Sequence, residues 1–359
     1  MFEIFRNLSD KFRGEGDSAI AIPVLDGALK PNRLLEDAEV FATLDAPEDL
    51  ATDGKSLFAA DGNQIVRFDR RNPVELRRFE STVTAITCLP GGGLAVAIDG
   101  RLVKVIGGPF DGREWSTVGG RALLSANAIS PGKAGTILVT EGSANQPYER
   151  WCHDLMERGR TGRLLQLDAR SGTGKELKKG LQYAFGCCAA EGAVWYSETW
   201  KHRVMTTGVS DHGETVVDWL PGYPCRISPA GDGGFWLCAM AGRTQLVEFV
   251  LRENGYRKRM MKEVDPRYWI APALSSTDDF LEPLQAAHVK MRGVLKPYAP
   301  PRSYGLVIRL DSKGIPVSSF QSRLDGKNHG VVAAVELQGM LFALAKGNRR
   351  ILKLPLRTV

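Results

Sequence analysis

Short apolar runs recur along the chain, each opened by a glycine and each followed, after a polar turn, by a second strand-like run. The six opening glycines are spaced by 39, 42, 57, 42 and 105 residues: Gly54, Gly93, Gly135, Gly192, Gly234 and Gly339. Repeats of about 40 residues that each hold several short strands are typical of β-propellers, in which one repeat forms one blade. The pattern therefore predicts an all-β, six-bladed β-propeller with short helical insertions.

Two intervals exceed the repeat length and predict insertions at 143–160 and 252–303. The first insertion carries apolar and aromatic residues at helical spacing, at Tyr148, Trp151, Leu155 and Met156. The second contains an amphipathic run over 278–295, where we expect a helix that begins at Asp278 or Asp279. Insertions of this length in compact folds are usually lids or binding loops, so we expect both to cover one mouth of the channel.

The remaining organisation follows from these boundaries. Residues 1–36 form an N-terminal leader and 37–359 the propeller, with the first blade expected over 37–70. Apolar residues of the leader fit one face of a short helix, which packs on the body or touches a membrane surface; they are Phe2, Phe5, Leu8 and Phe12. The leader has no continuous apolar run, so neither a secretory signal nor a transmembrane segment is predicted.

Charge and cysteine content bear on the predicted partners and location of the protein. Apolar residues make up 43% of the chain, which is ample for a core, and the net charge of +6 comes from scattered positive residues. A nucleic-acid-binding protein usually shows a dense basic stripe, so no nucleic-acid partner is predicted. The six cysteines contain no CxxC pair, which favours reduced thiols and a cytoplasmic location.

Three ordered segments resemble the strictosidine-synthase-like family. Residues 136–168 (TILVTEGSANQPYERWCHDLMERGRTGRLLQLD) are similar to its YFTDSS…TGRLLKYD signature. Residues 180–188 (GLQYAFGCC) are similar to GLxFANGV, and 220–238 (LPGYPCRISPAGDGGFWLC) to LPGYPDNI…DGSFWVA. The resemblance implies a propeller related to regucalcin, gluconolactonases and paraoxonases, and a lactone- or ester-hydrolase-like activity on a small molecule. It does not extend to strictosidine synthesis, because the position of that enzyme's catalytic glutamate falls on Val332.

Each repeat places one residue at the start of its innermost strand, facing the channel: Glu48, Thr84, Asn127, Phe185, Cys225 and Gly330. The resemblance implies a calcium site made by a glutamate, two asparagines and an aspartate at four such positions. Glu48 and Asn127 match it, but Phe185 and Cys225 replace the other two ligands. Since Ca²⁺ takes about six to eight oxygen ligands, calcium would need water or the first insertion to supply the rest. No other cofactor is indicated.

Glu48 and Arg226 suggest a different use of the channel. They either form an ion pair that closes it or build a site for a carboxylate, because a guanidinium binds carboxylates through two parallel hydrogen bonds. Glu141 and Glu198 end the second strands of their blades, where each caps a turn or serves as a general base. His153, in the first insertion, is placed to overhang the mouth, and His329 lies one residue before the last axial position.

These residues define the candidate site. The predicted catalytic residues are Glu48, His153 and Arg226, and the predicted substrate-binding residues are Asn127, Glu141, Tyr148, Phe185, Cys225 and His329. Three functions stay open. They are a lactone or ester hydrolase, a non-catalytic protein that binds a small carboxylate in an apolar pocket, and a scaffold for protein partners.

Overall fold

The computed structural model describes residues 22–190, 192–208, 213–277, 279–283, 285, 290–291, 294–295 and 302–356. The predicted helix of the leader lies outside these residues. No helix among those described is long and apolar enough to span a membrane.

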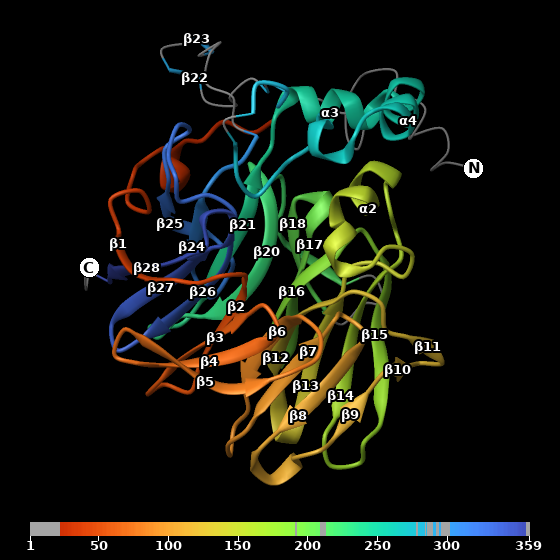
Figure 1. The fold of residues 1–359 in the computed structure, drawn as a ribbon, viewed down its shortest axis with the longest axis vertical. Helices are drawn as coiled ribbons and strands as arrows, with labels where there is room; N and C mark the ends of the chain where they lie inside the picture. The colour runs from red at the N-terminus through yellow and green to blue at the C-terminus, as the bar shows by residue number, and fades with distance from the viewer. Residues whose placement is uncertain are drawn as a thin grey trace.

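Six four-stranded antiparallel sheets form the blades of the propeller (Figure 1). Blade 1 contains β2 (Pro47–Thr52), β3 (Leu57–Asp61), β4 (Gln64–Asp69) and β5 (Asn72–Arg78). Blade 2 contains β6 (Val83–Cys88), β7 (Leu94–Ile98), β8 (Leu102–Ile106) and β9 (Glu114–Trp115). Blade 3 contains β12 (Ala126–Pro131), β13 (Thr136–Glu141), β14 (Gly162–Asp168) and β15 (Gly174–Leu181).

The second half of the chain forms the other three blades. Blade 4 contains β16 (Ala184–Ala190), β17 (Ala193–Glu198), β18 (Arg203–Thr206) and β19 (Glu214–Val217). Blade 5 contains β20 (Gly222–Pro229), β21 (Phe235–Gly242), β24 (Leu306–Leu310) and β25 (Pro316–Gln321). Blade 6 contains β26 (Val331–Leu337), β27 (Met340–Ala345), β28 (Arg350–Pro355) and, as its fourth strand, β1 (Glu39–Thr43).

The innermost strands close into a ring. Each of β2, β6, β12, β16, β20 and β26 contacts the next, and β26 contacts β2. Side chains alternate between the two faces of a strand, so the middle strands bury apolar residues against both neighbouring blades. Many of these residues are alanines, which let the sheets approach closely near the axis; fully buried examples are Ala59, Ala60, Ala95 and Ala97.

Strand β1 joins the two ends of the propeller. It pairs antiparallel with β28, so residues 39–43 complete the last blade, and their expected place in the first blade was wrong. The Phe41 ring lies 5.0 Å from Phe342 in blade 6 and 5.4 Å from Phe68 in blade 1. The strand thus covers a sheet edge that would otherwise expose unpaired backbone groups, and it ties blade 6 to blade 1.

Both insertions form helices at the same end of the propeller (Figure 1). The first forms η5 (Tyr148–Arg150) and α2 (Trp151–Glu157), which confirms the predicted helix. The second begins earlier than the predicted residue 252: α3 (Gln245–Arg252), capped by Thr244, replaces the expected strand-like run and is followed by α4 (Asn254–Glu263) and η7 (Pro266–Tyr268). The His153 ring of α2 lies 4.7 Å from the Trp269 ring, so the two insertions touch.

The helix expected over 278–295 is not formed by its described residues. Residues 280–282 form a turn and a bend, residues 279, 283 and 285 have no regular structure, and β22 (Lys290–Met291) pairs with β23 (Val294–Leu295). The other short elements are β10 (Thr117–Val118), β11 (Arg121–Ala122), η2 (Gly27–Leu29), η3 (Gly108–Phe110), η4 (Lys133–Gly135), η6 (Thr199–Lys201) and η8 (Lys346–Asn348).

Candidate functional site

Irregular pairing at the start of each innermost strand sets the geometry of the axis. In every blade the register with the second strand shifts within the first few residues of the innermost strand. In blades 1, 2, 3 and 6 the extra residue is Glu48, Thr84, Asn127 or Val332. Such bulges redirect side chains and are common beside functional sites. The axial residue of blade 6 is therefore Val332, not Gly330 as the repeat suggested.

The guanidinium of Arg226 lies where the innermost strands meet. One terminal nitrogen donates to the main-chain carbonyls of Thr84 and Asn127, at 2.8 and 2.7 Å. The other donates to the carbonyl of Val332 at 3.4 Å. Its Nε lies 3.1 Å from Oδ1 of Asp49, and the Arg226 side chain is only 8% exposed. This one side chain therefore joins blades 1, 2, 3, 5 and 6.

Phe185 supplies the contact to the remaining blade. The centre of the Arg226 guanidinium lies 5.0 Å from the centroid of the Phe185 ring, within the range of a cation–π interaction. Burial is the largest effect on Arg226 and lowers its pKa, but Asp49, together with smaller contributions from Tyr148 and Glu48, outweighs burial and raises the pKa of the guanidinium. Burial also raises the pKa of Asp49 to about 6, although Arg226 and two backbone N–H groups counteract it.

Glu48 forms its ion pair with Lys346. The ammonium of Lys346 hydrogen-bonds to Oε2 of Glu48, and the Tyr148 hydroxyl donates to the same oxygen at 2.7 Å. The expected pair between Glu48 and Arg226 is absent among the described residues, because Asp49 lies closer to the guanidinium and neutralises it. We call Glu48, Tyr148 and Lys346 the mouth cluster.

The mouth cluster keeps some access to solvent. The side chains of Glu48 and Lys346 are 12% and 20% exposed. Burial lowers the pKa of Lys346, against the opposing effect of Glu48, and burial raises the pKa of Tyr148 well above its usual value. Tyr148 therefore stays protonated and donates its hydrogen bond. Both contacts to Glu48 use Oε2, so within the described part of the chain Oε1 is the oxygen available to a ligand.

Lys346 was missed in the sequence. It follows β27 directly, where Gly62 follows β3 in blade 1 and Gly142 follows β13 in blade 3. A comparison of the residues that directly follow the second strands would have revealed a long cationic side chain in blade 6 at the position that glycine occupies in blades 1 and 3.

An aromatic wall stands beside the mouth cluster. The Phe185 ring lies 6.4 Å from Tyr148 and 5.9 Å from Tyr183, and Tyr183 stacks on Trp200 at 4.5 Å. These rings come from the first insertion and from blade 4. Both Phe185 and Tyr148 are buried, and Tyr148 contacts Glu48 directly, while their substrate-binding roles stay predictions.

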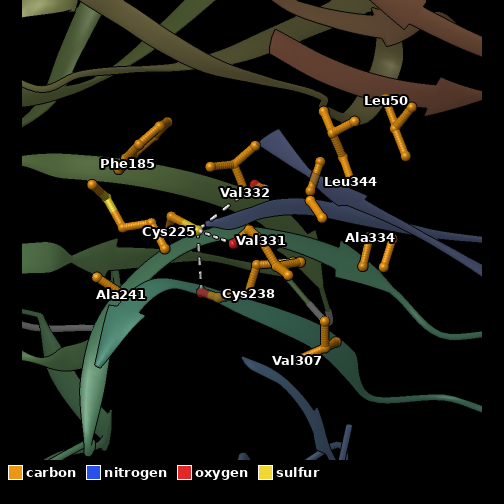
Figure 2. Packing of buried hydrophobic residues seen from close by; sticks show 14 of the residues in the cluster. Leu50, Phe185, Cys225, Cys238, Ala241, Val307, Val331, Val332, Ala334 and Leu344 are labelled. Carbon is orange, nitrogen blue, oxygen red and sulfur yellow. Dashed lines mark hydrogen bonds between the residues drawn. The ribbon is translucent and has the colours of Figure 1, made fainter. Parts of the chain in front are cut away.

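Cys225 does not face the channel. Figure 2 shows its sulfur turned toward the carbonyls of Cys238, Val331 and Val332, which lie at 3.3, 3.6 and 3.6 Å. The residue is fully buried between blades 5 and 6, and burial raises the pKa of the thiol to about 12. Because neighbouring side chains in a strand point to opposite faces, Arg226 reaches the axis and Cys225 does not. Its predicted contact with a substrate was wrong.

His329 is held by two hydrogen bonds within the protein. Its Nε2 donates to the carbonyl of Arg323 at 2.7 Å, so its Nδ1 accepts from the Ser303 hydroxyl at 2.8 Å. The ring is buried, and burial lowers its pKa. Both nitrogens are used, so His329 has no free atom for a substrate, contrary to its predicted role. His153 instead packs on Trp269, and no contact among the described residues joins it to the mouth cluster.

Glu141 caps a turn, which is one of its two predicted roles. It accepts a hydrogen bond from the backbone N–H of Leu124 at 2.9 Å and pairs with Arg163 at 2.6 Å. Asp61 and Glu198 do the same in their blades, accepting from the N–H groups of Ala46 and Gln182. Glu141 is fully buried and its carboxylate is bound by Leu124, Arg121 and Arg163, contrary to its predicted contact with a substrate.

No family model matches the chain. It is 26% identical over 347 residues to the adipocyte plasma membrane-associated protein of Salmo salar, covering 87% of this chain and 75% of that protein. It is 26% identical over 170 residues to protein strictosidine synthase-like 7 of Arabidopsis thaliana, covering 46% and 44% of the two chains.

Solved structures with the same fold include a gluconolactonase from Xanthomonas campestris. That structure has a TM-score of 0.56 at 13% identity, over 94% of this chain and 95% of the other. Regucalcin from Agrobacterium tumefaciens, a calcium-binding protein, has a TM-score of 0.52 at 8% identity, over 88% and 92%. The resemblance seen in the sequence is confirmed. The chain is a six-bladed β-propeller similar to strictosidine-synthase-like and gluconolactonase-like proteins.

The residues at the axis do not fit a calcium ion of the kind that the resemblance implied. The Asn127 side chain is committed within the protein, since its Oδ1 accepts from Thr140 at 2.7 Å and its Nδ2 donates to the carbonyl of Ala184 at 2.9 Å. Glu48 is paired with Lys346, and a fixed positive charge on Arg226 repels a cation. The described residues also contain no group of three or more His, Cys, Asp or Glu that could hold a metal ion.

Proposed function

We propose that the mouth cluster binds a small molecule with a lactone or ester carbonyl and hydrolyses it with protein side chains alone. The observation that supports this most directly is the contact of Lys346 and Tyr148 with one oxygen of Glu48, beside α2, which directly follows the η5 turn that carries Tyr148. A carboxylate beside a fixed ammonium offers a general base and a positive charge within one small site. The gluconolactonase-like fold is consistent with this class of reaction.

Each residue has a defined role in this scheme. Oε1 of Glu48 takes a proton from water while the water oxygen bonds to the carbonyl carbon, and the C=O electron pair moves onto oxygen. Lys346 stabilises that oxyanion with a hydrogen not used by Glu48 or Tyr148. The intermediate then expels the alcohol oxygen, which recovers the proton from Glu48. Tyr148 keeps the carboxylate in position, and Phe185 forms part of an apolar wall for the substrate.

The test is turnover of a panel of lactones and aryl esters in the presence of EDTA. We expect Glu48→Gln and Lys346→Met to lower kcat/KM by about 100-fold or more, because each removes a group that acts in the transition state. The control is Glu114→Gln. Glu114 forms an exposed ion pair with Lys104 at the outer edge of blade 2, so this variant should keep full activity. No turnover by the wild-type protein, or equal turnover by all variants, would rule out hydrolysis at this site.

A second function follows from Lys346 and its aromatic neighbours. The same site binds a small carboxylate without catalysis, with the ammonium as the anion ligand and the Phe185 ring as the apolar contact. Arg226 is not that ligand, because both of its terminal nitrogens already donate to main-chain carbonyls. This function predicts a rise in Tm with carboxylates that Lys346→Met abolishes, together with no turnover of the lactone and ester panel.

A further inference from the structure

Four oxygen atoms from four blades converge at the propeller axis. They are Oδ1 of Asp49 and the main-chain carbonyl oxygens of Thr84, Asn127 and Val332, and we call them the axial oxygens. Carboxylate and carbonyl oxygens are the ligands that a hard cation such as Ca²⁺ prefers. The axis therefore has donors suited to a cation, and the group that contacts all four is the guanidinium of Arg226.

We propose that Arg226 serves as a permanent, covalently attached cation that replaces a divalent metal at the axis. Its positive charge neutralises the buried Asp49 carboxylate, and its terminal N–H groups donate to the carbonyls of Thr84, Asn127 and Val332. The inner ends of the blades are thereby held together without any ion from solution. This role is independent of what the mouth cluster binds, so it goes beyond the proposed function.

The backbone around Arg226 is shaped for this position. A Cβ on Gly186 of blade 4 would lie 2.2 Å from the carbonyl oxygen of Cys225 and 2.8 Å from the Cα of Arg226. Only a glycine allows β16 and β20 to approach so closely. The Phe185 ring then covers the guanidinium at 5.0 Å, where a metal ligand would need a lone pair. Blade 4 thus favours an organic cation over a metal ion.

Removal of the side chain should convert the axis into a cation site. In Arg226→Ala the axial oxygens stay in place around an empty volume with an unpaired carboxylate, so Ca²⁺ or ethylguanidinium should bind there. In Arg226→Met a neutral chain fills most of that volume, so neither cation should bind. The pair of variants separates loss of charge from loss of packing.

Thermal unfolding of the two variants tests the proposal. We expect the Tm of the wild-type protein to be the same in EDTA, Ca²⁺ or millimolar ethylguanidinium. Both variants should melt on the order of 5 °C lower, because breaking a buried ion pair leaves an unpaired charge. Millimolar Ca²⁺ or ethylguanidinium should restore most of the loss in Arg226→Ala and none in Arg226→Met. Adding Asp49→Asn to Arg226→Ala should abolish the restoration by Ca²⁺.

Either of two melting results would overturn the proposal, and so would one refolding result. One is an Arg226→Ala protein that melts at the wild-type temperature. The other is an Arg226→Ala protein that is destabilised but regains nothing from either cation. If this variant unfolds on purification, it is refolded from urea with and without each cation. Recovery of folded protein only with a cation supports the proposal, and failure in every condition contradicts it. None of these measurements depends on lactone or ester turnover, so they test the proposal separately from the proposed function.

Discussion

Glu141 gives a quantitative test of the turn-capping acids that recur in the blades. Its carboxylate is fully buried, and its partner Arg163 has a side chain that is only 1% exposed. Glu141→Gln keeps an acceptor for the N–H of Leu124 but leaves the buried guanidinium without its nearest negative charge. Breaking a buried ion pair on one side typically costs about 3–5 kcal/mol. Glu176, 3.5 Å from the other end of Arg163, compensates in part, so we expect about 3 kcal/mol.

Urea unfolding of four proteins measures this value. They are the wild type, Glu141→Gln, Arg163→Met and the double variant. The double variant removes both charges, so it should be more stable than the sum of the two single losses predicts, with a coupling energy of about 1–3 kcal/mol. Glu149→Gln, at an exposed position two residues into the first insertion's short helix, should change the stability by less than about 0.5 kcal/mol. If Glu141→Gln were as stable as the wild type, the stabilising role of the buried Glu141–Arg163 ion pair would be refuted.

The other predictions concern backbone packing and pH. Gly186→Ala should destabilise the fold by about 3 kcal/mol in urea unfolding, because its Cβ would meet the backbone of Cys225. Gly255→Ala, in α4, is the matched control, because a Cβ added there would meet no other atom within 4 Å. It should raise the free energy of unfolding by about 0.5–1 kcal/mol. Burial opposes the charge of Glu248, yet His202 and Arg243 hold its pKa at about 2, below the ordinary 4.5. The ionised Glu248 carboxylate therefore contributes about 3 kcal/mol to the free energy of unfolding, fully above pH 4.5 and progressively less as the pH falls toward 2. The difference in stability between the wild type and Glu248→Gln should close over that pH range. A difference that stays constant would contradict this prediction.

The repeat predicted the fold because every blade carries the same local pattern of strands and turns. Strand β1 was placed in the wrong blade. Its partner β28 lies at the other end of the chain, and the sequence of a single strand does not indicate which distant strand it pairs with. The second insertion was expected to begin at residue 252 and to be helical at 278–295, yet the helical segment begins earlier, where Thr244 caps α3 shortly after β21.

The repeat also predicted part of the candidate site, because it gives the positions of residues along each blade but not their side-chain partners. Glu48, Asn127 and Phe185 were placed correctly at the axis, because their positions follow from the repeat. The partner of Arg226 was not, since Glu48 and Asp49 are adjacent carboxylates and only the bulge in β2 decides which one faces the guanidinium. Lys346 escaped notice because no motif marks it. The cytoplasmic location and the small-molecule ligand stay predictions.

The most direct measurement is an anomalous difference map of crystals grown with Mn²⁺, a cation that binds oxygen ligands and scatters anomalously. We expect no peak at the axis, with continuous density for the Arg226 guanidinium between Asp49 and the carbonyls of Thr84 and Asn127. A peak bound by Glu48 and Asn127, with Arg226 turned away from the axis, would contradict both the internal cation and hydrolysis without a metal.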